Sequence, residues 1–535
     1  MTKFFSRKYH RDLALFEAWD KLGDHVFRHI TRAQAKAAQL ALQGEIVWPT
    51  DKDYDQDRKL FNPVFDAHPI CIVYCKIESD LKTALDMARI SLLPFAVRSS
   101  GHCTAGFSAG PGVLIDVSNL NDVTIDATAM IATVAAACPF SKLDAALAQA
   151  NLHVPGGECP DVCIAGFMQG GGYGFTSVTY GMNCDNVIDM RVMLADQTIV
   201  TASPTVNSDL YWAMRGGTGG NFGILLTVRL TLRPMPDVFG FALIWPLQTV
   251  TDFDNATAAM NLLQSNYMLD KLPSALNIQV SLCYQPGTAG GLPVPGPMFP
   301  YLMVRGVYVG SQADGQAAIQ PLCDLPGAVT QWTKQSTFFD LNDELLNTPY
   351  GLPCLDPAKG MPNEDKASRY VSRAVTGDEW RGLLELFVTS PNETSYFYME
   401  FYGGAINQFP AYPDSKSNAF VHRTSAFNAV LDVFWYDGPT KDADKAAAED
   451  FLARWSNYMD RMWNGEIYQN YPQVGQPNYG PAYWGTAQGS LYAVKSKYDP
   501  HGRFTFAQQV TPPLVPQPVP TWLQDAIDQP IVPGT

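Results

Sequence analysis

The sequence predicts an α+β protein, in which a mixed α/β region precedes a region built on a large antiparallel sheet covered by helices. Strand-like and helix-like segments alternate over roughly the first 235 residues, whereas strand-like segments of alternating polarity dominate the residues that follow. The chain has 535 residues, which is more than one hydrophobic core ordinarily organises. We therefore expect two or three domains.

The first region begins with helix and strand signals in βαβ order. Residues 31–44 (TRAQAKAAQLALQG) have a threonine cap, alanine-rich filling and a terminal glycine, which predict a short surface helix. Buried-strand runs and helical spacing then alternate, at 70–75 (ICIVYC), 79–90 (SDLKTALDMARI), 93–97 (LPFAV), 112–117 (GVLIDV) and 131–152 (IATVAAACPFSKLDAALAQANL).

The second region contains longer strands and one long helix. The expected strands are at 276–285 (LNIQVSLCYQ), 301–310 (YLMVRGVYVG), 395–404 (SYFYMEFYGG) and 426–436 (AFNAVLDVFWY). The stretch 286–300 (PGTAGGLPVPGPMFP) is so rich in glycine and proline that we expect a long hairpin loop there. Residues 441–459 predict a helix against the sheet, and the proline-rich tail 512–524 predicts an extended surface segment.

Composition limits the kinds of partner that the protein can have. The formal net charge of -15 argues against nucleic acid and against an anionic membrane, because both need a basic surface. No run of eighteen apolar residues occurs, and the first thirty residues lack the apolar core of a secretion signal. We expect a cytoplasmic protein, mostly reduced thiols among its ten cysteines, no metal site and a small-molecule partner.

One histidine lies in an unusual setting. His102 stands between a glycine and a cysteine in RSSGHCTAGFS (98–108), directly after an apolar run. A histidine there can be a metal ligand, a general base or a point of covalent attachment. The residues themselves leave these three interpretations open.

Two segments, 156–187 and 209–228, are dense in glycine. Such segments let backbone N–H groups approach and bind an anion, most often a phosphate or pyrophosphate. Neither segment fits GxGxxG, and no GK dipeptide is present for a P-loop. A dinucleotide held in some other way is one interpretation, and tight turns between strands are the alternative.

Six motifs in order make the chain resemble a known family: RSSGH, GECPDV, GGGYG, TYGMNCDNV, DLYWAMRGGTGGNFG and KSKYDPHGRFTFAQQV. Together they resemble the berberine bridge enzyme-like FAD-linked oxidases of the vanillyl-alcohol oxidase superfamily, from about Gly44 to Pro512. The resemblance implies a vanillyl-alcohol oxidase-type FAD-binding domain of two α/β subdomains over residues 1–235, the second being 70–235. It also implies a substrate-binding domain over 236–475 and a C-terminal segment, 476–535, that returns to the FAD-binding domain.

The resemblance implies that FAD is bound covalently at two residues. By position, His102 would bond to the flavin 8α-methyl group (8α-histidyl) and Cys159 to flavin C6 (6-S-cysteinyl). Imidazole and thiolate are both nucleophiles that can add to an electron-poor ring. We expect an electropositive glycine turn to favour the Cys159 thiolate.

Further cofactor contacts follow from the same motifs. Arg98 to Gly101 would wrap the pyrophosphate with backbone N–H groups, which requires Ser100 to adopt a tolerable backbone angle where the family usually has glycine. Val162 resembles the small residue of family members that let dioxygen reach the flavin. The expected cofactor-binding set is Arg98, Ser99, Ser100, Gly101, His102, Cys159, Val162, Gly166, Gly170, Gly171, Gly172, Tyr173, Gly174, Asn221, Gly223, Ile224 and Gln508.

The residue that accepts the substrate proton departs from the family pattern. Counting from His422, the position of the berberine bridge enzyme glutamate is Leu431, and strand alternation would turn the neighbouring Asp432 to the opposite face. Glu400 offers a substitute, because a desolvated carboxylate among tyrosines has a raised pKa. An alternative is that Glu400 pairs with a structural arginine.

Three tyrosines complete the catalytic candidates. Tyr398 and Tyr402 share a strand face with Glu400, at the spacing of two that places alternate residues on one side. Tyr483 survives from the family's tyrosine motif, although the following Asn-Tyr is replaced by Thr486-Ala487.

The resemblance therefore implies an FAD-dependent oxidase that takes a hydride from a CH–OH or CH–N carbon to flavin N5. Dioxygen would reoxidise the flavin and give hydrogen peroxide, and the substrate would be a sugar, another alcohol or a natural product. The alternatives are a flavin dehydrogenase that uses another acceptor and a catalytically silent flavin-binding protein.

Overall fold

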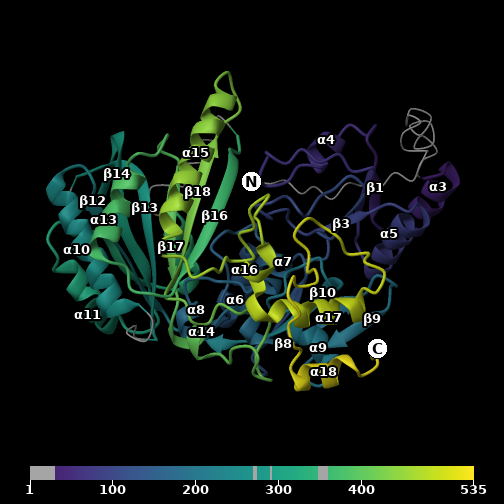
Figure 1. Cartoon of the computed structure of the whole chain (residues 1–535). Coiled ribbons are helices and arrows are strands. Elements are labelled where there is room, and N and C mark those ends of the chain that lie inside the picture. Colours follow the sequence, from purple (N-terminus) through teal and green to yellow (C-terminus); the bar gives the residue numbers. More distant parts are fainter. Residues whose placement is uncertain (1–29, 269–273, 290–291, 348–359, 535) are drawn as a thin grey trace.

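A computed structural model describes residues 30–268, 274–289, 292–347 and 360–534. Two parts lie side by side in Figure 1. One, the N-terminal part (30–234), contains two smaller sheets with their helices; the other, the large-sheet part (238–459), contains a seven-stranded sheet. This agrees with the expected α+β class, while the domain boundaries at 235 and 475 stay predictions.

The first small sheet confirms the βαβ start. Its order is β1-β2-β4-β3, and both β2 and β3 run parallel to β4. The strands are β1 (Glu45–Val47), β2 (Cys71–Tyr74), β3 (Phe95–Arg98) and β4 (Val113–Asp116), with helices α3 (Arg32–Ala41), α4 (Tyr54–Asp57) and α5 (Glu78–Ile90).

Helix α3 begins as predicted but ends earlier. The Thr31 side chain accepts from Gln34 N, and the Gln34 side chain closes the capping box. The helix stops at Ala41, so Gly44 is not its terminator. A Cβ at Gly44 would lie 1.8 Å from the Tyr74 carbonyl oxygen, so glycine is required there for the close approach of two strands.

The second small sheet is antiparallel, with the order β5-β6-β10-β8-β9. Its strands are β5 (Val123–Asp126), β6 (Ile131–Ala135), β8 (Val187–Met193), β9 (Ile199–Ala202) and β10 (Ile224–Thr231). A two-stranded pair, β7 (Leu152–His153) and β11 (Arg233–Pro234), lies beside it, with α6 (Phe140–Ala150), α7 (Ile164–Gln169), α8 (Ser177–Tyr180), η1 (Asn183–Asn186) and α9 (Ser208–Ala213).

The large sheet has the order β15-β12-β14-β13-β17-β18-β16, and every neighbouring pair is antiparallel. Helices cover one of its faces (Figure 1). The strands are β12 (Val238–Pro246), β13 (Leu276–Ala289), β14 (Leu292–Tyr308), β15 (Val329–Ser336), β16 (Asn363–Val371), β17 (Tyr396–Phe401) and β18 (Phe427–Trp435). The helices are α10 (Val250–Tyr267), α11 (Gln312–Cys323), α12 (Phe338–Leu346), α13 (Gly377–Phe387), α14 (Gly404–Gln408) and α15 (Lys441–Met459).

The hairpin expected at 286–300 is confirmed, but its described residues, 286–289 and 292–300, are not a loop, because they continue β13 and β14 as a paired ladder. The physical reason is the width of the sheet at this point. The ladder between β12 and β14 ends at Pro246 and Tyr301, so the part of β14 before Tyr301 has a paired neighbour only on the β13 side. Proline lacks an N–H donor and is tolerated where one edge of a strand is unpaired.

The C-terminal helices pack on the N-terminal part (Figure 1). They are α16 (Tyr479–Trp484), η3 (Gly485–Ala487), α17 (Gln488–Tyr498) and α18 (Thr521–Ile527). Asp209 of α9 accepts from Lys497 Nζ at 2.6 Å and from Tyr498 OH at 2.7 Å. The expected extended tail is confirmed for 512–520 and wrong for 521–524, where Pro520 precedes the first turn of α18, a place that proline tolerates.

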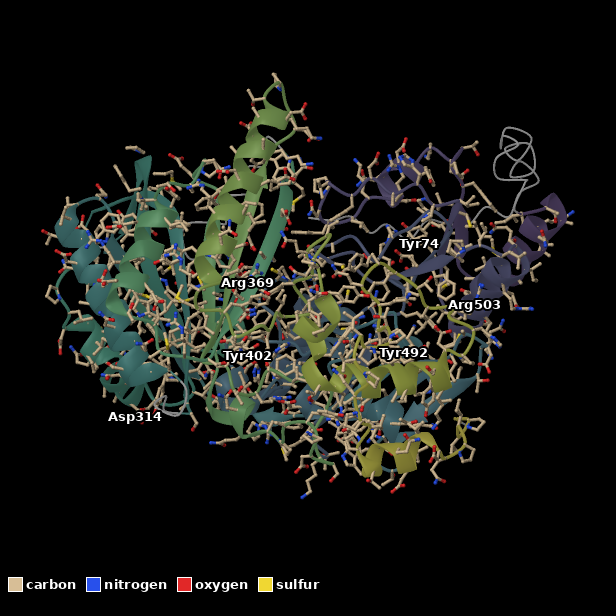
Figure 2. All side chains as sticks on the ribbon, viewed as in Figure 1. Tyr74, Asp314, Arg369, Tyr402, Tyr492 and Arg503 are labelled. Atoms are coloured by element: carbon tan, nitrogen blue, oxygen red, sulfur yellow. The ribbon has the colours of Figure 1, made fainter. Side chains whose placement is uncertain are left out.

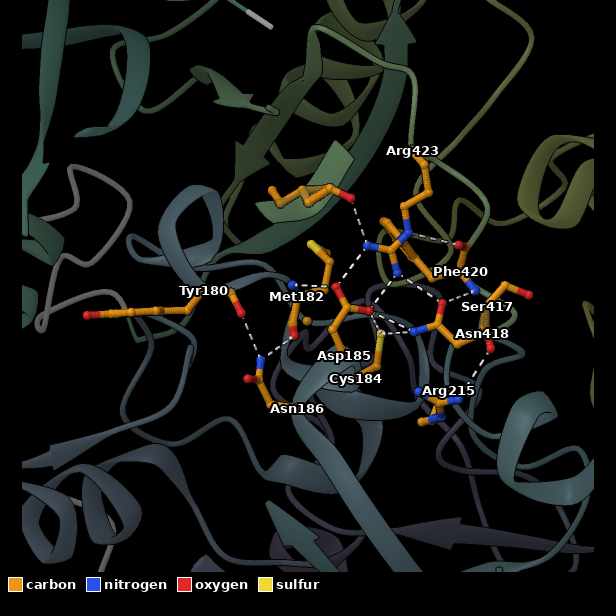
Figure 3. Close-up of polar contacts among 12 residues, drawn as sticks. Tyr180, Met182, Cys184, Asp185, Asn186, Arg215, Ser417, Asn418, Phe420 and Arg423 are labelled. Atoms are coloured by element: carbon orange, nitrogen blue, oxygen red, sulfur yellow. Dashed lines mark hydrogen bonds and ion pairs between the residues drawn. The ribbon is translucent and has the colours of Figure 1, made fainter. Parts of the chain in front are cut away.

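A buried ion pair joins the two parts (Figure 3). Both guanidinium nitrogens of Arg423 contact the Asp185 carboxylate, at 2.8 and 2.6 Å, and both residues lie deep in the protein. Asn418 donates to the same carboxylate at 2.7 Å, and Arg215 Nη2 donates to the Ser417 carbonyl. The segment between α14 and β18 is thereby fixed to the N-terminal part.

Two negative findings concern the described residues only. None of their helices combines the length and apolar character needed to cross a membrane. No group of three or more His, Cys, Asp or Glu side chains among them has an arrangement suited to a metal ion.

Candidate active site

The face of the large sheet opposite α10, α11, α13 and α15 carries a group of polar side chains and lies toward the N-terminal part, with α12 packed over one end of it. Directly paired residues of neighbouring strands lie on the same face. Glu400 pairs with Asn428 and Gln279, and Lys366 pairs with Asp432. We call this surface the polar face and define it by Gln279, Arg305, Lys366, Tyr396, Tyr398, Glu400, Asn428 and Asp432.

Glu400 is the central carboxylate of the polar face. It is only 2% exposed, and it accepts from Tyr471 OH at 2.6 Å and from Asn428 Nδ2 at 3.0 Å. Burial raises the pKa of Glu400 to about 7, while the two hydrogen bonds oppose the rise. The raised pKa was expected, and both hydrogen bonds come from neutral side chains rather than from an arginine. A carboxylate with a pKa near neutrality suits a general base.

The expectation that Asp432 points away from this site is wrong. Asp432 pairs with Tyr396 and therefore shares the polar face, whereas Leu431 pairs with Phe397 and belongs to the core under the helices. Counting along the chain from His422 cannot fix the face, because the intervening residues up to Ala426 are irregular and set the register of β18.

Asp432 belongs to a small charged cluster. Lys366 Nζ lies 3.2 Å from Asp432 Oδ2 and 3.3 Å from Glu364 Oε1, and it sits over the Tyr471 ring at 4.8 Å. Burial raises the pKa of Asp432, and the Lys366 charge opposes the rise. The polar face thus carries two carboxylates of different character, Glu400 held by neutral donors and Asp432 held by a cation.

The two expected attachment residues differ in their surroundings. His102 is partly buried and stacks on Phe61 with ring centroids 4.1 Å apart. Burial lowers its pKa to about 4, so the imidazole is neutral and keeps a lone pair at physiological pH. That value fits a nucleophile better than it fits a general base working near neutral pH.

Cys159 is exposed, but its surroundings are not electropositive as expected. The side chain is accessible, yet the protein around it desolvates the thiol and raises its pKa to about 12, and the Glu158 charge acts in the same direction. The reason is that, among the described residues that act on this thiol, the acidic Glu158, Glu364 and Asp432 outnumber the cation Lys366. Thr104, two residues after His102, donates to the carbonyl of Pro472, the neighbour of Tyr471, at 2.9 Å, and Glu158 contacts Gln279 and Arg305, so the loops of His102 and Cys159 both lie beside the polar face.

The RSSGH loop has the backbone that the resemblance requires. Gly101 has a φ of +81°, whereas Ser100 is not among the residues with positive φ, so serine is tolerated. The Arg98 side chain pairs with Asp116 at 2.6 Å, so Arg98 and Ser99 would contact a pyrophosphate through the backbone. These contacts stay predictions.

The GGGYG glycines do not offer their N–H groups to an anion. The N–H groups of Gly171, Gly172 and Gly174 donate to Met168 O, Tyr468 OH and Ser177 Oγ. Their lack of side chains serves packing instead, because a Cβ at Gly171 would lie 2.7 Å from Phe420 and one at Gly174 would lie 1.8 Å from a carbonyl oxygen. Tight packing therefore explains these three glycines, and a cofactor-lining role for Gly170 to Gly174 stays a prediction.

The other expected cofactor residues lie in defined positions. Tyr173 donates to Phe401 O at 3.0 Å and stacks on Tyr402, which places it against the large sheet. Val162 N donates to Cys159 O at 3.3 Å and closes the turn at Cys159. A Cβ at Gly166 would meet open space, whereas one at Gly223 would lie 2.5 Å from the Val192 side chain. Ile224 is the first residue of β10. Asn221 accepts hydrogen bonds from Val510 N and Lys495 Nζ.

The tyrosine candidates do not all converge on Glu400. Tyr398 lies beside Glu400 on the polar face. Tyr402, at the junction of the two parts in Figure 2, forms a hydrogen bond between its hydroxyl group and that of Tyr370. Tyr483 donates to Gln508 Oε1 at 2.7 Å in the C-terminal segment. None of the described contacts joins Tyr483 to Glu400, and its catalytic role stays a prediction.

Sequence reasoning missed Tyr471, Asn428 and Lys366. Tyr471 belongs to an irregular segment, so no periodicity marks it. Asn428 lies on a strand that was predicted, and Lys366 lies on one that was not. Only the pairing of the strands shows that both residues share the face of Glu400. A cross-strand alignment of 363–371 with 427–435 is the signal that would have found them.

Comparisons with known proteins agree with this geometry. Residues 69–203 match the FAD binding domain family, and residues 467–511 match the family described as berberine and berberine like. The FAD-linked oxidoreductase YvdP of Bacillus subtilis is 26% identical over 484 residues, covering 88% of this chain and 98% of the relative. A carbohydrate oxidase of Microdochium nivale is 26% identical over 515 residues, covering 90% and 96%.

A solved structure shows the same fold. The berberine bridge enzyme-like 1 protein of Physcomitrella patens superimposes with a TM-score of 0.76 at 22% identity, over 89% of this chain and 99% of that protein. The two matched families stand in the order that the motifs predicted, and the relatives span nearly the whole chain. The chain is an FAD-linked oxidoreductase that carries the FAD binding domain and the berberine and berberine like domain and is similar to the berberine bridge enzyme-like proteins.

Proposed function

We propose that the protein is an oxidase that converts a CH–OH group of a carbohydrate to a carbonyl, with FAD bonded to both His102 and Cys159. Glu400 is the base, and dioxygen is the final electron acceptor. The observation that carries the proposal is Glu400 itself, a buried carboxylate with a pKa of about 7 on the face to which the Cys159 loop is bound through Glu158.

The residues present fit a bound FAD. His102 supplies a neutral imidazole, and Cys159 supplies an exposed thiol in the same region. Gly101 adopts the left-handed conformation that lets backbone N–H groups turn toward a pyrophosphate. When bound, FAD supplies an acceptor for the hydride that leaves the substrate carbon.

Glu400 takes the proton of the reacting hydroxyl group. A base near its own pKa at neutral pH is ionised often enough to accept a proton and basic enough to hold it. The Tyr471 hydroxyl and the Asn428 amide fix both carboxylate oxygens, so the base presents a single orientation. Such positioning reduces the entropy that the reaction must lose.

Two acceptor atoms on the polar face favour a polyhydroxylated substrate. Asn428 Oδ1 and Asp432 Oδ1 are buried, and no donor among the residues that the structure describes bonds to either atom. A buried acceptor without a donor is costly, and substrate hydroxyl groups would satisfy both atoms. The similarity to a carbohydrate oxidase supports the same substrate class. The small Val162 beside Cys159 supports access of dioxygen.

Mass spectrometry of tryptic peptides tests the attachment. Trypsin cleaves after Arg98, Lys142 and Arg191, so His102 falls in peptide 99–142 and Cys159 in peptide 143–191. We expect the flavin to join these two peptides into one cross-linked species. Two unmodified peptides, or flavin released on denaturation, would exclude covalent attachment.

Oxygen consumption and peroxide release then test the reaction. We expect mono- and oligosaccharides to bleach the flavin without oxygen and to release one hydrogen peroxide per turnover with oxygen. Bleaching without peroxide release would identify a dehydrogenase. A failure of every sugar, alcohol and amine to bleach the flavin would identify a silent flavin-binding protein.

A further inference from the structure

The loop that carries Cys159 is held by side chains of the large-sheet part. Glu158, the preceding residue, accepts from Gln279 Nε2 of β13 at 3.1 Å. Its other oxygen lies 3.3 Å from Arg305 Nη2 of β14. Asn342 of α12 also donates to the Gly157 carbonyl at 3.4 Å. The loop belongs to the N-terminal part, but its position is set from across the boundary.

Arg305 is itself tightly fixed. Its side chain is 4% exposed, its Nε donates to Gln279 Oε1 at 3.0 Å, and its Nη2 donates to Tyr396 OH at 3.0 Å. The guanidinium also lies over the Phe175 ring at 5.4 Å, and Nη1 donates to a backbone carbonyl of α12. Because so many partners hold the planar Arg305 guanidinium in one orientation, the guanidinium fixes the position of the Glu158 carboxylate that contacts it.

Cys159 has fewer restraints of its own. Within its loop, the Cys159 carbonyl accepts from Val162 N, and the Cys159 side chain is exposed. The thiol is therefore located by the residues on either side of it, and on the N-terminal side these are Glu158 and Gly157, both bound to the large-sheet part.

We propose that Glu158 and Arg305 form a clamp that positions the Cys159 sulfur for its bond to flavin C6. The inference rests on the proposed function, because it assumes that the bond forms. Bond formation replaces the hydrogen on C6 by sulfur, so the thiol and the ring carbon each lose a proton. The two electrons released pass to dioxygen, which takes up both protons and leaves as hydrogen peroxide.

The clamp matters because attack on a ring carbon requires close approach and correct direction. A displacement of about 1 Å from the productive position costs roughly 100-fold in rate. Without the clamp, the loop loses its charged tie to the sheet, whereas His102 lies on a different loop and keeps its own position. Loss of the clamp should therefore affect one of the two flavin bonds and spare the other.

The test uses the full chain loaded with FAD and counts the tryptic peptides. In Glu158→Ala and in Arg305→Met, we expect peptide 99–142 to carry the flavin and peptide 143–191 to be released unmodified. The cross-linked fraction should fall about tenfold or more after equal times of FAD loading. Retention of flavin on peptide 99–142 shows that each variant is folded.

Arg305→Met separates positioning from proton transfer. It leaves the Glu158 carboxylate in place, so a role of Glu158 as the base of the thiol would leave the cross-link intact in this variant. Because Arg305 is buried and has several partners, Glu158→Ala, at a partly exposed position, decides the result if Arg305→Met yields no folded protein.

Asp161→Ala is the matched control. It removes an equal charge from the same loop, two residues beyond Cys159, at an exposed position. We expect this variant to keep the full cross-link, and an equal loss would mean that charge, not the clamp, is responsible. A full cross-link in Glu158→Ala overturns the inference alone. A wild-type protein without the cross-link overturns the proposed double attachment as well.

Discussion

The two faces of the large sheet are made by alternate residues of the same strands, yet buried charged side chains gather on only one of them among the described residues. On β17, Phe397, Met399 and Phe401 enter the core under the helices, and Phe397 packs against Trp455 of α15. The residues between them, Tyr398 and Glu400, enter the polar face. One strand therefore supplies packing residues and, in the proposed function, the catalytic base at a spacing of one residue.

The same contrast between the two faces appears on β18. Leu431 continues the covered core, and its neighbour Asp432 binds Lys366 on the polar face. Side-chain orientation in a strand has a period of two, so a shift of one residue exchanges the two roles. Acidic function and hydrophobic packing can thus be changed independently by substitutions at adjacent positions.

The largest expected effect comes from Glu400→Gln on the polar face. The amide keeps the shape of the side chain but cannot accept the substrate proton, so the rate of flavin reduction should fall by about 10²–10⁴-fold. Stopped-flow absorbance without oxygen measures this rate. The flavin should remain attached to the protein.

Asp144→Asn is the control for that substitution. Burial raises the pKa of Asp144, on α6, to about 7 as well, but this carboxyl does not belong to the polar face. Its replacement should leave flavin reduction unchanged. An unchanged rate in Glu400→Gln would remove Glu400 from the mechanism.

Leu431→Ala tests the covered face. Leu431 is fully buried, and its truncation should lower the free energy of unfolding by about 2–5 kcal/mol through the lost contacts and the cavity left behind. Denaturant unfolding measures the loss. The reduction rate of the folded variant should equal that of the wild type, and a selective loss of rate with normal stability would contradict the separation of the two faces.

Stability should depend on pH through Glu400 in the direction opposite to activity. The folded-state pKa of about 7 lies above the ordinary value of 4.5, so the folded protein binds more protons between these values. The Glu400 contribution to stability is therefore complete below about pH 4.5 and declines as the pH rises to about 7, by about 3 kcal/mol. Unfolding of the wild type and Glu400→Gln across this range should show the difference, and parallel curves would contradict it.

The smallest expected effect comes from Tyr471→Phe. The Tyr471 hydroxyl lowers the pKa of Glu400 by donating a hydrogen bond to the carboxylate, so its removal should raise that pKa further. The acidic limb of the reduction-rate profile should move to higher pH, by up to about one unit. A limb that stays in place would show that another group controls it.

Much of the architecture could be predicted from the sequence, because strand and helix periodicity are local properties. The strands at 70–75 and 276–285 and the helix at 441–459 were found in this way. The strand pairing within 286–300 was missed, because a strand tolerates these prolines only where one of its edges is unpaired. That depends on where the neighbouring strand β12 ends. Proximity of Gly44 to Tyr74 is likewise a tertiary property.

The candidate site was predictable only where a motif marks it. His102, Cys159 and Glu400 have local signals, in a glycine-rich turn, a GxCP turn and a tyrosine-rich strand. The orientation of Asp432 was not predictable, because one irregular segment before β18 decides its face. Lys366 was missed for a related reason, since its strand, β16, pairs with β18 across a long sequence separation.

The bonds of Arg423 make the molecule one cooperative unit. Its guanidinium binds both oxygens of Asp185, Asn418 Oδ1 and the carbonyls of Ile406 and Phe420, so pulling the two parts apart would break a buried ion pair. Breaking such a pair costs about 3–5 kcal/mol. Neither part is therefore expected to persist as a separately folded fragment, and the site between them is created or lost with the whole chain.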